Sequence, residues 1–223
     1  MNAVHNLNRF INHSNIYTSF TIYGTLSGAS YDKLNTDIAR HDYPAMKGPL
    51  GGVGFGISHE YYSRWVLEFY FTTLGLTNKV KKDDSTLKAN FSNLLQVNFG
   101  YDFIKSNKIN IYPYAGLAVR VSELDYIAPV LTNDNYTSIL DIVRMDGSAY
   151  ATRWSLAYQA GVNFDFVIHE NADKGRGTML FLRAGTDGTF SNSSFKIHGL
   201  KYDPQIKQGA WQIAFGFKFF GRD

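Results

Sequence analysis

The chain has 223 residues and a formal net charge of +3, and it combines 17 Phe, 15 Tyr and 3 Trp with only 18% charged residues. The small, scattered positive charge leaves no footprint for nucleic-acid binding, and the absence of cysteine excludes disulfides and thiolate metal sites. No run of about 18 apolar residues occurs, which excludes a transmembrane helix but not a transmembrane strand, whose signal is weaker.

The first fifteen residues show neither a regular alternation nor a basic region followed by an apolar run. We therefore expect a mature-form chain without a signal peptide, and we predict that residues 1–15 are an N-terminal extension. The folded domain is predicted to span residues 16–223.

Two-residue alternation recurs along this domain, and each run predicts a β-strand with one apolar and one polar face. The predicted strands are approximately 17–27, 50–59, 64–76, 89–104, 110–122, 152–168, 178–186 and 209–220. The clearest run, 89–104, sets Phe91, Leu95, Val97 and Phe99 against Ser92, Gln96, Asn98 and Gly100. In the run 50–59 the polar face is almost bare, because it consists of Gly52, Gly54, Gly56 and Ser58.

The connections between these strands alternate in length. Segments 29–49, 77–88, 123–151 and 187–208 are long and polar, whereas 60–63, 105–109 and 169–177 are short. Short periplasmic turns and long extracellular loops are typical of bacterial outer-membrane barrels, which places both termini and the extension at the periplasmic end. The predicted fold is all-β, an eight-stranded antiparallel up-and-down transmembrane β-barrel.

The polar faces carry about one charge per strand, where a water-facing surface would carry several. These charges are Glu68, Asp102, Arg120, Asp165, Arg183 and Lys218, three of each sign. Because an eight-stranded lumen is just wide enough for side chains to fill it, we predict a charge network that plugs the lumen, with Glu68 facing Arg120 or Arg183. An ion or proton pathway is the other interpretation.

Three segments carry a family resemblance. Pro113-Tyr114-Ala115-Gly116-Leu117-Ala118-Val119, Tyr158-Gln159-Ala160-Gly161-Val162-Asn163-Phe164-Asp165 and the final strand resemble the small outer-membrane barrels of the OmpA/OmpX/OmpW type, particularly the PorT-like barrels. The resemblance implies localisation in the cell outer membrane. It also implies contact with outer-membrane lipid and lipopolysaccharide, with the barrel-assembly machinery during insertion, and with other outer-membrane proteins.

The last strand also resembles the C-terminal signal that the assembly machinery reads. The residues concerned are Trp211, Ile213, Phe215, Phe217, Phe219 and Phe220. The signal usually ends on an aromatic residue, whereas Gly221-Arg222-Asp223 follow Phe220 here. The alternative interpretation is that these aromatic side chains only face lipid.

The histidines give little support for catalysis. His13-Ser14-Asn15 resembles a deacylase motif but lacks the intervening residue, and only His41 and His198 share the long-loop end. No two histidines have metal-ligand spacing on one strand. We expect no catalytic residue, cofactor or metal.

The sequence thus predicts a non-enzymatic barrel that acts structurally, through its long loops, or as a subunit of an outer-membrane complex. Two alternatives stay open. One is a narrow OmpW-like conduit for small apolar molecules, and the other is a lipid A-modifying barrel enzyme.

Overall fold

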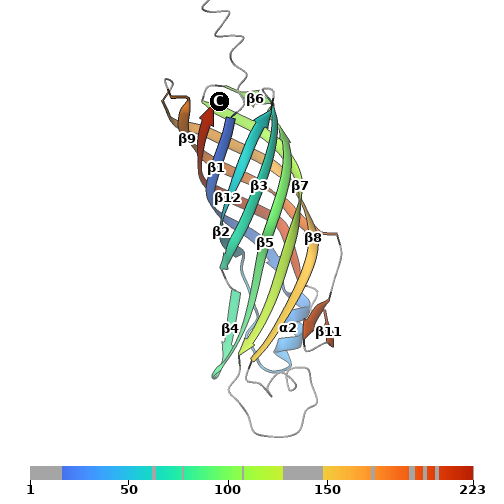
Figure 1. Cartoon of the computed structure of the whole chain (residues 1–223). Coiled ribbons are helices and arrows are strands. Elements are labelled where there is room, and N and C mark those ends of the chain that lie inside the picture. The colour runs from blue at the N-terminus through green and yellow to red at the C-terminus, as the bar shows by residue number, and fades with distance from the viewer. Residues whose placement is uncertain are drawn as a thin grey trace, which may run out of the picture.

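The computed structural model describes residues 17–61, 64–76, 78–106, 108–127, 148–171, 174–190, 194–197, 200–203 and 206–222. Eight long antiparallel strands form a closed ring (Figure 1). They are β1 (Tyr17–Ser30), β2 (Leu50–Tyr61), β3 (Trp65–Leu76), β5 (Ser85–Tyr101), β7 (Ile109–Ile127), β8 (Ser148–Asn171), β9 (Arg176–Thr189) and β12 (Lys207–Arg222). Each pairs with the next in sequence, and β12 pairs with β1. The predicted fold class is confirmed.

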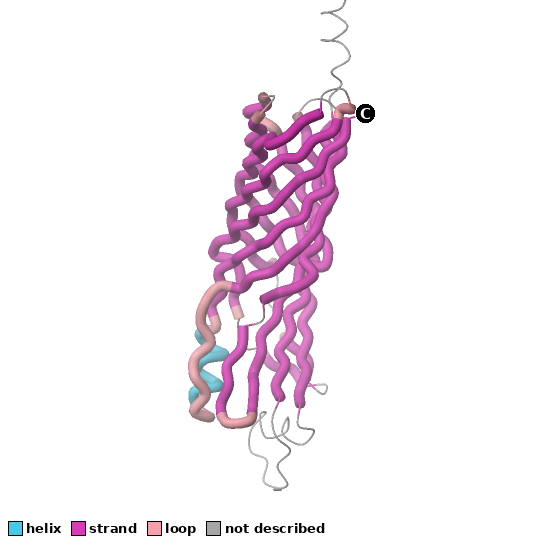
Figure 2. Tube along the Cα trace, turned by 90° about the vertical axis from the view of Figure 1, so that its left-hand side faces the viewer, coloured by secondary structure: helices cyan, strands magenta, loops and turns pink. Residues whose placement is uncertain are grey.

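The start of β1, the end of β12 and the described parts of the short connections lie at one end of the barrel (Figures 1 and 2). Tyr17 pairs with Arg222 across the closing seam, so β1 begins where β12 ends. The two-residue strand β6 (Ile104–Lys105) pairs with the start of β7 at this same end. The predicted extension, residues 1–15, lies outside the described residues.

The predicted long loops are partly wrong. The segment 77–88 is mostly a hairpin, formed by β4 (Asn78–Lys82) and the start of β5. The segment 29–49 contains the helix α2 (Asp32–Ala39), and 187–208 contains the end of β9, β10 (Phe195–Ile197), β11 (Leu200–Tyr202) and the start of β12. Strands β7 and β8 run on into 123–151, of which residues 128–147 lie outside the described part.

These strand extensions were missed because the apolar face changes sides beyond the membrane. Within the barrel wall the apolar residues point outward, whereas in the extensions Leu87, Leu124 and Tyr126 point inward and are buried. A sequence pattern with the apolar face outward therefore predicts strands that end too early at the extracellular side.

A bulge in β5 also corrects one predicted face. Asn93 pairs with Arg120 but Leu95 pairs with Val119, so Leu94 is an extra residue. One extra residue reverses the inside and outside positions that precede it. Phe91, predicted to face outward with Leu95, is instead buried inside.

The outer wall carries large exposed apolar side chains over its whole circumference. Examples from different strands are Ile22, Phe55, Phe69, Leu117, Leu156, Leu182 and Phe217. A water-soluble surface rarely holds so large an apolar area, whereas hydrocarbon requires it. Near the short-turn end, Trp65 stacks on Phe99 with the ring centroids 4.9 Å apart, in the position of an aromatic girdle. Among the described residues, no helix is long and apolar enough to cross a membrane.

Candidate functional site: a filled lumen and an extracellular cap

The lumen near the periplasmic end is centred on the buried carboxylate of Glu68 on β3. This carboxylate forms an ion pair with the guanidinium of Arg183 on β9 and lies 3.7 Å from Nζ of Lys218 on β12. It also accepts hydrogen bonds from the hydroxyls of Tyr112, at 2.7 Å, and Tyr70, at 3.1 Å. Donors from opposite walls thus meet on one anion at this level of the lumen.

Lys218 extends the cluster to β8, which is two strands away from β12 in the ring. Its Nζ lies 2.7 Å from Oδ2 of Asp165 on β8 and donates to the Tyr112 hydroxyl at 2.8 Å. Arg183 lies over the ring of Tyr114, 4.1 Å from its centroid, a cation–π contact. Glu68, Asp165, Arg183 and Lys218 therefore form one buried cluster with two charges of each sign.

The glycine-rich face of β2 makes room for aromatic rings in this layer. A Cβ at Gly56 would lie 2.0 Å from Cδ1 of Tyr70, and a Cβ at Gly54 would lie 2.5 Å from Cζ of Tyr23. Both tyrosines are buried, and their rings meet edge to face with the centroids 5.4 Å apart. The bare strand face in the sequence is thus a packing surface inside the lumen.

A second ion pair lies nearer the extracellular end. Nη2 of Arg120 lies 2.5 Å from Oδ2 of Asp187, and its Nε donates to Oδ1 of Asn93 at 2.8 Å. Arg120 therefore does not face Glu68. The sequence pattern predicts a loop at Asp187. In the structure, Asp187 continues the series of inward-facing positions formed by Arg183 and Gly185 on β9, and this alternation is the sequence feature that indicates its place in the lumen.

Asp102, the remaining predicted member, is buried just after the last residue of β5. Its backbone N–H donates to the carbonyl of Arg64 at 2.8 Å, at the periplasmic end. The structure thus joins four of the six predicted residues in one cluster and places Arg120 in another.

At the extracellular end, α2 packs into the barrel extension (Figure 1). Leu34 and Ile38, one turn apart on the helix, are buried in a single apolar cluster. Its other members are Tyr31, Tyr43, Met46, Leu50, Val80, Leu87, Ala89, Phe91, Leu124, Tyr126, Ala151, Phe195 and Ile206. Burial raises the pKa of the Tyr31 phenol. We call this cluster the extracellular cap.

Polar contacts fix the segment that follows α2. Asn35 donates to the carbonyl of Met46 at 3.0 Å and accepts from its N–H at 2.8 Å. Nζ of Lys82 on the β4–β5 hairpin donates to the carbonyl of His41 at 2.7 Å. The cap is therefore attached to the barrel wall by hydrogen bonds as well as by apolar packing.

The histidines do not converge on a catalytic arrangement in the described part of the chain. His41 follows α2, while His13 and His198 lie outside the described residues. The ring of His59 shares a hydrogen bond of 2.8 Å with Oγ1 of Thr18, but this pair lies on the outer wall near the periplasmic end. The described residues contain no group of three or more His, Asp or Glu that could hold a metal ion.

The predicted assembly signal lies on β12. Trp211, Ile213, Phe215, Phe217 and Phe219 all point to the exposed outer wall. Phe220 instead points inward and packs on Met179. Its role in assembly stays a prediction.

No family model and no curated protein matches the chain. Among solved structures, Ail, the attachment invasion locus protein of Yersinia pestis, matches 92% of this chain with 99% of its own, at 15% identity and a TM-score of 0.51. The outer membrane protein OprG of Pseudomonas aeruginosa matches 95% with 98% of its own, at 13% identity and a TM-score of 0.48. Neisserial surface protein A matches 91% with 95% of its own, at 14% identity and a TM-score of 0.42.

Likeness at this level of identity concerns the fold alone, and the narrower resemblance to PorT-like barrels stays a prediction. Transmembrane barrels with short turns at one end and long connections at the other are built in the bacterial outer membrane. With its closed ring of eight strands and its apolar outer wall, the chain has the fold of the small outer-membrane β-barrels of the OmpA/OmpX/OmpW type.

Proposed function

We propose that this chain is a non-enzymatic outer-membrane barrel with a closed lumen, whose extracellular end serves as a surface for interaction or for assembly into an outer-membrane complex. The observation that carries the proposal is a pair of buried clusters at two levels of the interior. The Glu68 cluster lies in the lumen within the membrane, and the extracellular cap lies beyond it.

A conduit for small apolar molecules has less support. Such a conduit needs an apolar path, whereas the membrane-spanning part of the lumen holds buried ion pairs and hydrogen-bonded tyrosines. Among the described residues, the largest apolar cluster of the interior lies at the extracellular end, where α2 occupies it, and only small apolar clusters lie at the levels of the charged groups. An apolar solute would therefore have to displace the helix and then pass charged groups.

The β4–β5 hairpin favours an anionic partner at the extracellular end. Lys79 and Lys81 are exposed, and Lys79 lies directly opposite Lys88 in the ladder. Like charges in directly opposite positions destabilise a sheet unless an anion offsets them. Asp125, 3.7 Å from Lys88, offsets one of the three charges. The structure of Ail has been solved in complex with the heparin analogue sucrose octasulfate. In an outer membrane, the phosphate groups of lipopolysaccharide are the anions that lie beside the extracellular end of a barrel.

Affinity purification in mild detergent tests the proposal. We expect a co-purifying outer-membrane protein or lipopolysaccharide, and we expect its loss when residues 128–147 are replaced by a short Gly-Ser linker and Lys79 and Lys81 by Gln. The control carries a Gly-Ser insertion at Lys174-Gly175, in the periplasmic turn before β9. If the partner is lost only from the control variant, the extracellular end is not the binding surface. If the wild type and both variants are recovered without a partner, the proposed interaction is contradicted.

A further inference from the structure

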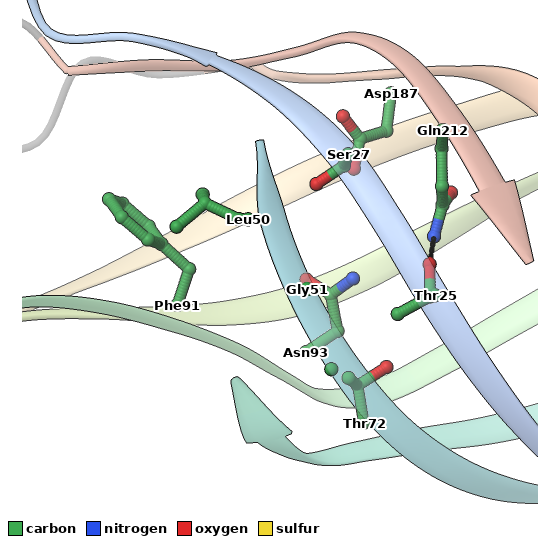
Figure 3. A pocket seen from close by; sticks show the side chains of 10 residues that line it. Thr25, Ser27, Leu50, Gly51, Thr72, Phe91, Asn93, Asp187 and Gln212 are labelled. Carbon is green, nitrogen blue, oxygen red and sulfur yellow. Dashed lines mark hydrogen bonds between the residues drawn. The ribbon is translucent and has the colours of Figure 1, made fainter. Parts of the chain in front are cut away.

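The lumen offers little space for a ligand beneath the extracellular cap. A cavity of about 20 Å³ lies there beside Asp187 and Gln212, and Nε2 of Gln212 donates a hydrogen bond of 3.3 Å to Oγ1 of Thr25 (Figure 3). This volume corresponds to about one water molecule. A larger molecule therefore finds space on the outer surface and not at this level of the lumen.

A groove of about 210 Å³ lies on the outer wall between β7 and β8. It is lined by Val119, Trp154, Ser155 and Leu156. Of these residues only Ser155 is buried, while Trp154 is 60% exposed. Pockets that enclose a whole drug-sized ligand measure about 300–1,000 Å³, so this groove is large enough for one part of a molecule.

The groove lies where the outer wall changes from apolar to polar toward the extracellular end. On the membrane side, Leu95, Val119 and Leu156 follow one another on β5, β7 and β8 and are exposed. Two rows further out, the outward positions of the same strands are polar: they are Asn90, Glu123 and Thr152. Trp154 lies in the row between them, at the level where a bilayer surface favours tryptophan.

The carboxylate of Glu123 is the centre of the polar side. It accepts hydrogen bonds from the hydroxyl of Tyr150, at 2.6 Å, and from Nδ2 of Asn90, at 3.2 Å. A carboxylate can accept about four hydrogen bonds, so these two fix its orientation and leave room for further donors. Glu123 lies diagonally opposite Trp154 in the β7–β8 ladder, which places their Cβ atoms about 7 Å apart. A fixed acceptor thus lies beside an exposed indole ring.

We propose that this part of the outer wall binds a membrane glycolipid, with its sugar ring at Trp154 and Glu123 and its acyl chain in the groove beside Leu156. A sugar ring has an apolar C–H face, which can pack on an aromatic ring, and a rim of hydroxyl groups, which can donate to a carboxylate. An acyl chain needs an apolar surface that continues into the membrane, and the row of Leu95, Val119 and Leu156 provides one.

An anionic head group fits this site poorly. A phosphate at Trp154 would meet the carboxylate of Glu123, and like charges repel. Lys88 on the same face is offset by Asp125 at 3.7 Å. The inference does not rest on the proposed function, because the exposed lysines that favour an anionic partner belong to the β4–β5 hairpin and the sugar site lies on β7 and β8.

Binding is tested with octyl glucoside, below its critical micelle concentration, on the ¹⁵N-labelled full chain in lipid nanodiscs. The chain has three tryptophans and therefore three indole N–H resonances. Trp65 and Trp211 are exposed on other parts of the outer wall and serve as internal controls for Trp154. We expect a saturable shift of the Trp154 resonance alone, and no such shift with octyl phosphate or with glucose.

Each other result would overturn the proposal. No saturable shift would mean that the site does not bind a glycolipid, and equal shifts of all three indoles would mean unspecific uptake of the amphiphile into the lipid. An equal response of Trp154 to octyl phosphate would mean that only the alkyl chain is recognised. An equal response to glucose would mean that the groove takes no part.

The contribution of the carboxylate is tested by Glu123→Leu. Losing a charged acceptor should weaken the binding of octyl glucoside about tenfold. The matched control is Asp84→Leu, which removes an exposed carboxylate from the turn of the β4–β5 hairpin and should leave the affinity unchanged. Unaltered resonances of Trp65 and Trp211 show that each variant keeps the folded barrel. Binding by Glu123→Leu as tight as that of the wild type would refute recognition of the sugar by this carboxylate.

Discussion

Replacing Glu68 by Ala is the substitution whose effect the lumen geometry specifies most closely. The change removes the anion that pairs with Arg183 and contacts Lys218, and it leaves the hydroxyls of Tyr70 and Tyr112 without their acceptor. Lys218 keeps Asp165 at 2.7 Å, so the main loss falls on Arg183. Removing one partner of a buried ion pair costs about 3–5 kcal/mol, because the other charge stays buried.

Urea unfolding of the refolded protein in detergent micelles or liposomes measures this loss. The control is Asp125→Ala, which removes a half-exposed ion pair with an N–O distance of 3.7 Å and should cost less than about 1 kcal/mol. The double variant Glu68→Leu/Arg183→Leu removes both charges and should recover most of the stability that Glu68→Ala loses. An unfolding free energy for Glu68→Ala equal to that of the wild type would refute the network as a structural element.

Three further outcomes are expected. Leu34→Asp puts a carboxylate into the extracellular cap and should expose residues 31–49 to protease while the barrel keeps its folded mobility in gel electrophoresis; a protected segment would contradict the cap. Phe219→Ser should slow insertion by the purified assembly machinery more than Phe190→Ser, an exposed phenylalanine at the other end, and equal rates would argue against the signal. The hydrogen bond to Glu123 is the main cause that raises the pKa of Tyr150 to about 12, so this phenol should titrate near pH 12 in difference spectra against Tyr150→Phe. Its pKa should fall toward the ordinary tyrosine value once Glu123 is Gln. Since the pKa of Tyr150 is higher in the folded state, any stability that this hydrogen bond contributes is complete below pH 10 and disappears as the pH rises through 12. An unchanged titration of Tyr150 in the Glu123→Gln variant would show that Glu123 does not cause the raised pKa.

The membrane-spanning part of the fold was predictable from sequence because one physical rule governs it. Hydrocarbon outside and a packed polar lumen inside put apolar and polar residues at alternate positions, as in Ile213 and Phe217 against Gln212 and Lys218. Beyond the membrane water lies outside, so Leu87 and Leu124 turn inward. In this part of the barrel the apolar positions of the alternation face the interior instead of lipid. The extensions of β5, β7 and β8 were therefore not predicted.

The candidate site was predictable only in its composition. The sequence identifies which charges face the lumen, but their partners depend on register and on how far each strand extends. Asp187 was missed because β9 continues three residues beyond its predicted end, and this left Arg120 without its actual partner. The helix α2 was missed because its apolar signal, Leu34 and Ile38, covers only one turn.

Single-channel recording in planar bilayers tests the closed lumen most directly. If the lumen is closed as we propose, the Glu68 cluster and the extracellular cap block it at two levels, and the refolded wild-type chain should insert without discrete conductance steps. Reproducible openings of uniform size from the folded wild-type protein would contradict the closed barrel and return the conduit to first place.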